Sequence, residues 1–140
     1  MPDVFTKEKR SEVMGKIKGK DTRIERMVAR WLHQAGLRYR KHNRSIPGSP
    51  DISIKKYKIA IFVHGCFWHG HPGCKKYKPP QSRSAFWAEK IARNQARDRQ
   101  VFETLKATGW HVFLVWECEI EQDFDFVMHE MKTKMDAIMA

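Results

Sequence analysis

Apolar residues recur at helical spacing near the start of the chain, at positions i, i+3, i+4, i+7, i+8 and i+11. They are Ile24, Met27, Val28, Trp31, Leu32 and Ala35. Asp21 or Thr22 can cap the start of this helix. Thr22 and Glu25 have the spacing of a capping box, and Gly36 stands where a left-handed C-terminal cap belongs. The pattern therefore predicts an amphipathic helix that ends close to Gly36.

The rest of the chain predicts an alternation of strands and helices. Strands are expected at Tyr39–Lys41, Asp51–Ile54, Lys58–His64 and Trp110–Cys118, with a turn at Lys55–Tyr57 and further helices at Thr6–Lys18, Ser84–Lys106 and 124–138. The order ααβββαβα predicts an α/β fold in which helices flank a central mixed β-sheet. A chain of 140 residues suits one domain. We expect Trp31, Trp110 and Trp116 in its core.

The charge of the chain is distributed unevenly. Lys and Arg number 27 against 16 Asp and Glu, a net charge of +11. Residues 1–100 hold 24 basic and 8 acidic side chains, whereas residues 101–140 hold 3 and 8. This basic excess favours a polyanionic partner such as nucleic acid, although a solvated basic face is the alternative. The candidate phosphate contacts are Arg10, Lys16, Lys18, Lys20, Lys75, Lys76, Lys78 and Arg83.

No apolar run approaches the length of a membrane span. The longest runs, Ile59–Val63 and Val112–Trp116, have five residues each, against about 20 for a transmembrane helix. The first residues lack the apolar stretch of a signal peptide. We therefore expect a protein of the reducing cytoplasm, in which three cysteines serve as metal ligands or free thiols.

A loop rich in Gly, Pro, His and Cys, Gly65–Pro80, follows the central strand. Zinc prefers a tetrahedron of thiolates and imidazoles. The loop and the end of the last strand supply such a set: Cys66, His71, Cys74 and Cys118. Because four protein ligands leave no open position, the zinc would be structural. The alternative is three free thiols and a surface histidine.

Asp51 is the one acidic residue of a long basic stretch. An acid among cations would be strongly ionised and could hold Mg²⁺ against a phosphate. A histidine can accept a proton from the attacking water, and His64, His69 and Glu25 are expected nearby. These neighbours favour catalysis. The alternative is a turn residue paired with a cation such as Arg44.

Short motifs occur along the chain in a fixed order. They are Arg10-Ser-x-x-Met14-x-x-Ile17, Asp21-Thr22-x-x-Glu25, Leu37-x-x-Arg40, Pro47-Gly-x-Pro-Asp51, Ile61-Phe-Val-His64-Gly-Cys66-Phe-Trp-His69, Phe86-Trp87-x-x-Lys90, Asn94-x-x-Arg97-Asp98, and Gly109-Trp110 followed by Val115-Trp116-Glu117-Cys118. In this combination, over about residues 10–118, the sequence strongly resembles the very-short-patch mismatch repair endonucleases, the Vsr family. The resemblance implies a compact single-domain relative of the restriction-endonuclease fold, PD-(D/E)xK. It also implies Mg²⁺-dependent nicking 5′ to the T of a T·G mismatch, which arises when 5-methylcytosine deaminates.

The resemblance implies roles for individual residues. Asp51 and the Val63 carbonyl would bind the catalytic Mg²⁺, while His64, His69 and Glu25 would organise the attacking water. His69 is our choice for the general base. The four zinc-ligand candidates would hold the structural Zn²⁺. The central strand has neither the second acid nor the lysine of the generic signature, so histidine must take over that work.

Three aromatic residues, Phe67, Trp68 and Trp87, flank the loop and the start of the long helix. Flat side chains of this kind can insert between base pairs and unstack them. Core packing is the alternative, but the resemblance implies intercalation by all three.

We therefore expect a single endonuclease domain over residues 1–140, with a basic N-terminal arm at 1–20 and a zinc loop at 65–80. Its partner would be double-stranded DNA with a T·G mismatch, bound by a monomer in the bacterial cytoplasm at the nucleoid. A contact with a further mismatch-repair protein is left open. Two rival functions are a DNA-binding zinc module without catalysis and a restriction-type nuclease that cuts matched duplex.

Overall fold

The computed structural model of the chain describes residues 22–74 and 83–140. Its elements are α2 (Arg23–Gln34), β1 (Arg40–Lys41), β2 (Ile52–Ile54), the 3₁₀ turn η1 (Lys55–Tyr57), β3 (Ile59–His64), α3 (Ser84–Ala107), β4 (His111–Trp116) and α4 (Glu117–Met139). The helices and strands predicted in these segments are confirmed, except that β4 ends and α4 begins earlier than predicted. The predicted helix Thr6–Lys18 lies outside them. No helix in the described segments is long and apolar enough to cross a membrane.

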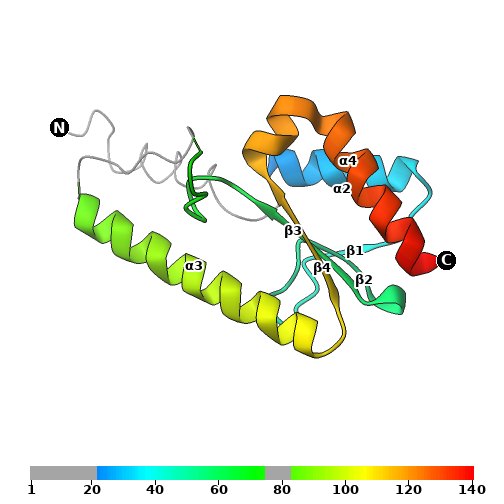
Figure 1. Ribbon diagram of the computed structural model, residues 1–140, viewed down its shortest axis with the longest axis horizontal. Helices are drawn as coiled ribbons and strands as arrows, with labels where there is room; N and C mark the ends of the chain where they lie inside the picture. Colours follow the sequence, from blue (N-terminus) through cyan, green and yellow to red (C-terminus); the bar gives the residue numbers. More distant parts are fainter. Residues whose placement is uncertain (1–21, 75–82) are drawn as a thin grey trace.

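The four strands form one mixed sheet in the order β1-β2-β3-β4 (Figure 1). The pairs β1–β2 and β2–β3 are antiparallel, whereas β3 and β4 are parallel and joined through α3. In this register His64 lies opposite Trp116. The predicted α/β class with a central mixed sheet is thereby confirmed.

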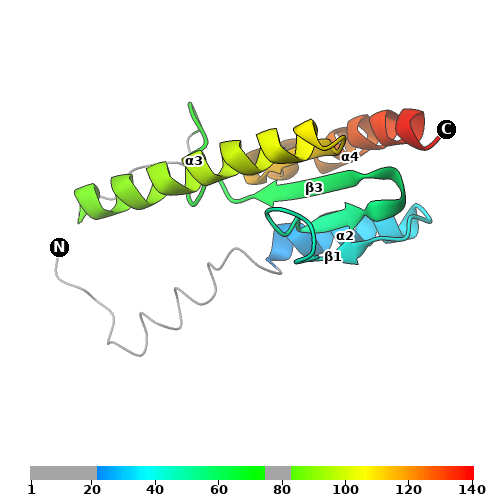
Figure 2. The same cartoon turned by 90° about the horizontal axis from the view of Figure 1, so that it is seen from below.

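Helices cover both faces of the sheet, as Figures 1 and 2 show, with α2 and α4 on one face and α3 on the other. Alternate residues of β3 face the two sides: Ile59, Ile61 and Val63 pack in the core with α2 and α4, and Ala60 and Phe62 pack in the core with α3. Strand β3 is buried along its whole length, which explains its almost continuous apolar sequence.

The end of β4 differs from the prediction. The strand stops at Trp116, and Cys118 lies in the first turn of α4. The carboxylate of Glu119 accepts a hydrogen bond from the Trp116 amide at 3.1 Å and so stabilises a helix start. α4 then kinks at Asp123, which has φ −157° and ψ 86° and whose carboxylate accepts a hydrogen bond from the Phe126 amide at 3.1 Å. The predicted last helix is the part after this kink.

Candidate active site and metal centre

The candidate site lies where β2 begins and β3 ends. Asp51 directly precedes β2, and the antiparallel pairing of these strands brings it beside Val63, whose amide donates a 2.7 Å hydrogen bond to Asp51 Oδ2. A cavity of about 740 Å³ opens at this point. Its lining residues are His42, Gly48, Ser49, Asp51, Phe62, Val63, His64, His69, Arg97, Asp98 and Val101. Three of the four predicted catalytic residues therefore line one cavity.

The fourth, Glu25, reaches Asp51 from the first turn of α2. Thr22 caps this helix, since its hydroxyl accepts a 3.3 Å hydrogen bond from the Glu25 amide. The Glu25 side chain is 1% exposed, and its Oε2 lies 3.3 Å from Nε2 of His42. Nδ1 of His42 lies 4.0 Å from Oδ1 of Asp51. One imidazole thus lies between two carboxylates.

The environment of Asp51 is less cationic than its sequence suggests. Burial, together with the charge of the Glu25 carboxylate, raises the pKa of Asp51 to about 8, while the Val63 amide opposes that rise. The expectation of a strongly ionised acid is not met in the metal-free chain, because burial and the neighbouring Glu25 carboxylate favour the protonated form. Oxygens of Glu25 and Asp51 and a nitrogen of His42 lie within 4.8 Å of one another, a donor set that fits a divalent cation.

A second group joins the end of β3 to α3. Nδ1 of His69 lies 2.6 Å from Oδ2 of Asp98, and Nδ1 of His64 lies 3.9 Å from the same oxygen. The two imidazoles are stacked, with ring centroids 3.6 Å apart. Burial, reinforced by the charge of His69, lowers the pKa of His64 to about 3, against the opposing effect of Asp98. His64 is therefore neutral at physiological pH.

The loop that carries His69 is tied to α3 through its backbone. The Asn94 amide group donates to the Trp68 carbonyl at 2.9 Å, and the Gln95 amide group donates to the Gly70 carbonyl at 2.8 Å. Gly70 has φ +57°, and a Cβ there would lie 2.5 Å from Nε2 of Gln95. A side chain at this position would be strained by the left-handed backbone and would displace the Gln95 amide group that binds the loop.

The four zinc-ligand candidates meet in space. Nδ1 of His71 lies 3.6 Å from Sγ of Cys66 and 3.4 Å from Sγ of Cys118, and one donor atom from each of these residues and from Cys74 fits within 4.8 Å. A tetrahedral zinc with ordinary bond lengths separates sulfur from nitrogen by about 3.6 Å. Burial raises the pKa of the Cys66 thiol to about 12 and raises that of Cys118. The donor set and spacing fit Zn²⁺.

Trp116 is not in the core, contrary to the prediction. Its ring stacks on His71 with a centroid separation of 4.0 Å and meets His64 edge-on at 5.2 Å. It therefore links the zinc-ligand candidates to the candidate active site. Trp31 and Trp110 do pack against the cores on the two faces of the sheet.

The three aromatic residues predicted to insert between base pairs form one cluster. Phe67, Trp68 and Trp87 are each half-buried, and their ring centroids are 5.4 to 5.6 Å apart. The Lys90 ammonium lies 5.3 Å from the centre of the Trp68 ring. Neither core cluster of the described residues contains these rings, so core packing does not account for them.

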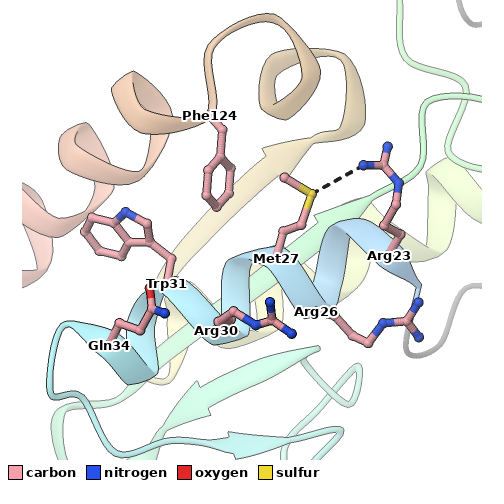
Figure 3. A pocket seen from close by; sticks show the side chains of 7 residues that line it. All are labelled: Arg23, Arg26, Met27, Arg30, Trp31, Gln34 and Phe124. Atoms are coloured by element: carbon pink, nitrogen blue, oxygen red, sulfur yellow. Dashed lines mark hydrogen bonds between the residues drawn. The ribbon is translucent and has the colours of Figure 1, made fainter.

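A second cavity, of about 290 Å³, lies between α2 and α4 (Figure 3). The side chains that line it are Arg23, Arg26, Met27, Arg30, Trp31, Gln34 and Phe124. Arg23 donates a hydrogen bond to the Met27 sulfur at 3.5 Å. This lining suits an anion but contains no carboxylate or imidazole that could bind a cation or accept a proton. The candidate catalytic residues therefore belong to the first cavity.

Sequence reasoning missed His42, Arg97 and Asp98 as site residues. For Asp98 a signal exists: it lies on the face of α3 that carries Ile91 and Leu105, and a carboxylate on a buried helical face is unusual. For His42 there is none, because only the fold of the segment between β1 and β2 brings it to Asp51.

The comparisons with known proteins agree with this site. A family model described as DNA mismatch endonuclease Vsr matches residues 2–76. The chain belongs to the Vsr family. A type II nicking enzyme of Neisseria meningitidis serogroup A is 46% identical over 121 residues, which are 86% of each protein. The DNA mismatch endonuclease Vsr of Escherichia coli K12 is 44% identical over 120 residues, 86% of this chain and 76% of that protein.

A type II nicking enzyme of Xanthomonas oryzae is 43% identical over 120 residues, 86% of this chain and 88% of that protein. Membership in the Vsr family confirms the resemblance read from the motifs. It also confirms the enzyme class, a DNA endonuclease with DNA as its substrate, and implies a divalent metal. The Glu25–His42–Asp51 group has the donors for such an ion, whereas the Vsr motifs had drawn attention to Asp51 and Glu25 but not to His42.

Proposed function

We propose that this Vsr-family chain nicks one strand of DNA 5′ to the T of a T·G mismatch, with Mg²⁺ as the catalytic ion and Zn²⁺ as a structural ion. Such mismatches arise when 5-methylcytosine deaminates. One observation supports the catalytic part above others: Asp51, His64, His69 and Asp98 line a single cavity. A cation-binding carboxylate and a carboxylate-oriented histidine are the two groups that phosphodiester hydrolysis needs.

Asp51 would hold the Mg²⁺, and Glu25, for which the resemblance implies a role in organising the attacking water, would here act as a further ligand. The Val63 amide fixes the orientation of Asp51 through Oδ2. When bound, Mg²⁺ neutralises negative charge that develops on the phosphate. A cation also lowers the pKa of Asp51 from its raised value and keeps the carboxyl ionised. Whether the Val63 carbonyl adds a ligand stays a prediction.

His69 would take the proton from the attacking water. Its Nδ1–H donates to Asp98 at 2.6 Å, which leaves Nε2 as the free acceptor and stabilises the imidazolium that forms. His64 stacks on this ring and is neutral. The neutral His64 ring therefore fixes the orientation of the His69 ring by stacking and does not oppose the positive charge that His69 gains with the proton. Arg97, which lines the same cavity, is a candidate contact for the scissile phosphate.

The Zn²⁺ would hold the loop that carries His69, Phe67 and Trp68, next to Trp87 on α3. Cys66 and His71 lie on this loop, and Cys118 lies on α4, so one ion would join the end of β3 to the last helix. Phe67, Trp68 and Trp87 would insert between base pairs at the mismatch. Unstacking costs least at a mismatched pair, so wedge insertion discriminates by energy.

The remaining expectations rest on the sequence. We propose that the enzyme acts as a monomer on chromosomal DNA in the bacterial cytoplasm, as a single domain with its basic arm at 1–20 on the phosphates. Of the candidate phosphate contacts, only Arg83 lies in the described residues, where its guanidinium covers the Phe86 ring at 4.4 Å. A contact with another mismatch-repair protein stays a prediction.

Nicking of end-labelled duplexes tests the function. A library with one central T·G pair in varied sequence contexts is compared with matched A·T and G·C duplexes, each with Mg²⁺ or with EDTA. The variants are Asp51→Ala and, as a matched control on the exposed end of α4, Asp136→Ala. We expect a nick only in the T strand, only with Mg²⁺, and absent in Asp51→Ala.

Two other outcomes contradict the proposal. Cleavage of matched duplex in the same assay would indicate a restriction-type nuclease. Retained binding of the T·G duplex without any cleavage, by zinc-loaded wild type, would indicate a binding module.

A further inference from the structure

His42 occupies a position that its sequence neighbours do not explain. Its backbone is left-handed, with φ 51°, and its amide donates to the Asp51 carbonyl at 3.1 Å. A left-handed conformation is uncommon for residues other than Gly, and Asn, Asp and His are the side chains that adopt it most readily. Here it directs the imidazole between the Glu25 and Asp51 carboxylates, at 3.3 Å and 4.0 Å.

Glu25, His42 and Asp51 can each offer one ligand atom to a single small ion. A divalent cation with bonds of about 2.1 Å holds neighbouring octahedral ligands about 3.0 Å apart and opposite ligands about 4.2 Å apart. The 3.3 Å and 4.0 Å distances start from Nε2 and Nδ1 of His42, and only one of these nitrogens can bind a given ion. One His42 nitrogen and one oxygen from each carboxylate nevertheless lie within 4.8 Å of one another, close to the separation of opposite ligands. Asp51 has Oδ1 on the His42 side, because its Oδ2 accepts the Val63 amide.

We propose that His42 is a third protein ligand of the divalent-cation site, which therefore binds Mn²⁺ in preference to Mg²⁺. The inference rests on the proposed function only in placing that ion at Asp51. Mg²⁺ prefers oxygen ligands and keeps several waters, whereas imidazole nitrogen suits the first-row transition metals. A site of two carboxylates and one imidazole thus has a built-in selectivity that two carboxylates alone lack.

Direct binding of Mn²⁺ and Mg²⁺ to the full-length, zinc-loaded protein tests the proposal without DNA. Free Mn²⁺ is followed by its electron paramagnetic resonance signal, and Mg²⁺ by competition against bound Mn²⁺. The variants are His42→Gln and His42→Asn, the second because Asn tolerates the left-handed backbone. His33→Gln, at the exposed end of α2, is the matched control.

We expect both His42 variants to bind Mn²⁺ about tenfold or more weakly, with Mg²⁺ affinity changed by less than about twofold. In wild type, pulsed electron paramagnetic resonance of bound Mn²⁺ should show coupling to a directly bonded imidazole nitrogen. This coupling should be lost in both His42 variants and kept in His33→Gln. Asp51→Asn should abolish the Mn²⁺ site.

The competing role for His42 is that of a cation that pairs with the two carboxylates. Removal of that cation would tighten Mn²⁺ and Mg²⁺ binding alike, the opposite sign, and would overturn the proposal. Nitrogen coupling that survives in both His42 variants would also overturn it. Zinc content and thermal unfolding of each variant establish that the fold is intact.

The failure of this inference differs from the failure of the proposed function. If T·G duplex is not nicked with any ion, yet nitrogen coupling disappears in the His42 variants, the proposed function fails and the His42 ligand stands. If nicking follows the proposal but Mn²⁺ affinity is unchanged in the His42 variants, only the inference about His42 fails.

Discussion

Nδ1 of His69 and Oδ2 of Asp98 are separated by 2.6 Å, and this contact joins the loop that follows β3 to the middle of α3. The two residues are 29 positions apart in sequence. The carboxylate selects the tautomer with the proton on Nδ1 and leaves Nε2 as a base. Asp98 is thus a positioning residue for the proposed general base.

Asp98→Asn should lower kcat for T·G nicking by about 10²- to 10⁴-fold. The amide keeps the shape of the carboxylate but can no longer stabilise the imidazolium, and it favours the wrong tautomer. Single-turnover nicking under saturating enzyme measures this loss, and duplex affinity should change little. If Asp98→Asn nicks at the wild-type rate across pH 6 to 9, His69 does not depend on this carboxylate.

Asp51→Asn should stabilise the metal-free protein at high pH. Since burial and Glu25 raise the pKa of Asp51 to about 8 from 3.8, the folded state binds a proton that the unfolded state has released between these values. The stabilisation from that proton is full below the unfolded pKa and is lost as pH rises through the folded pKa. Asn does not ionise and so keeps its stability as pH rises. The free energy of unfolding of Asp51→Asn should therefore exceed that of wild type by an amount that grows from about pH 5 to pH 8.

We expect the gain at pH 8 to be of the order of 1–2 kcal/mol, or roughly 3–8 °C in Tm. Thermal unfolding in EDTA-free, Mg²⁺-free buffer at several pH values measures it, and Asp136→Asn is the exposed control. Saturating Mg²⁺ should narrow the difference by stabilising the wild type. A constant Tm difference across this pH range would contradict the raised pKa.

The elements of this fold could be predicted because their signals are local. The apolar stripe of α2 and the buried run of β3 are periodic patterns that need no knowledge of the rest of the chain. The start of α4 was not predicted, because the expected strand was carried past the end of the apolar run at Trp116, through Glu117 to Cys118. There a capping contact from Glu119 decides where the strand stops.

The site was only partly predictable for the same reason. Cys66 and His71 are close in sequence, and their chemistry restricts what they can do. The neighbours of Asp51 follow from chain folding: Glu25 arrives on α2 and His42 through a left-handed backbone. Consequently the grouping of the four zinc-ligand candidates followed from the sequence, whereas the raised pKa of Asp51 did not, since it depends on burial and on a second carboxylate.

Removal of one zinc ligand should destabilise the whole site. Cys74→Ser should lose bound zinc and lower the free energy of unfolding by several kcal/mol, because ligand binding to the folded state contributes to folding. Zinc content and thermal unfolding measure this, with His111→Gln on the exposed start of β4 as the control. Unchanged stability in zinc-free Cys74→Ser would show that the loop needs no ion.

The same centre predicts a dependence on pH. Burial raises the pKa of the Cys66 and Cys118 thiols in the metal-free chain, so zinc must displace protons to bind thiolates. Zinc uptake by the metal-free protein in weak buffer should therefore release protons, and zinc affinity should fall as pH is lowered. Uptake without proton release would mean that the thiols are not the ligands.

Trp68→Ala should separate mismatch recognition from folding. The Trp68 ring lies in the half-buried aromatic cluster, and its buried Nε1 has no hydrogen-bond partner within residues 22–74 and 83–140, so no hydrogen bond of the ring is lost when it moves to DNA. Loss of the inserted ring should weaken binding of the mismatched duplex by about 1–3 kcal/mol, or lower kcat/KM on the T·G duplex by about 5- to 150-fold.

Thermal stability of Trp68→Ala should change by much less than that of Trp110→Ala, which leaves a cavity against the core under α3. Tryptophan fluorescence of Trp68→Phe, compared with wild type on T·G and matched duplexes, reports whether the ring stacks on bases. Equal losses of nicking and stability in Trp68→Ala would instead assign the cluster to packing of the loop.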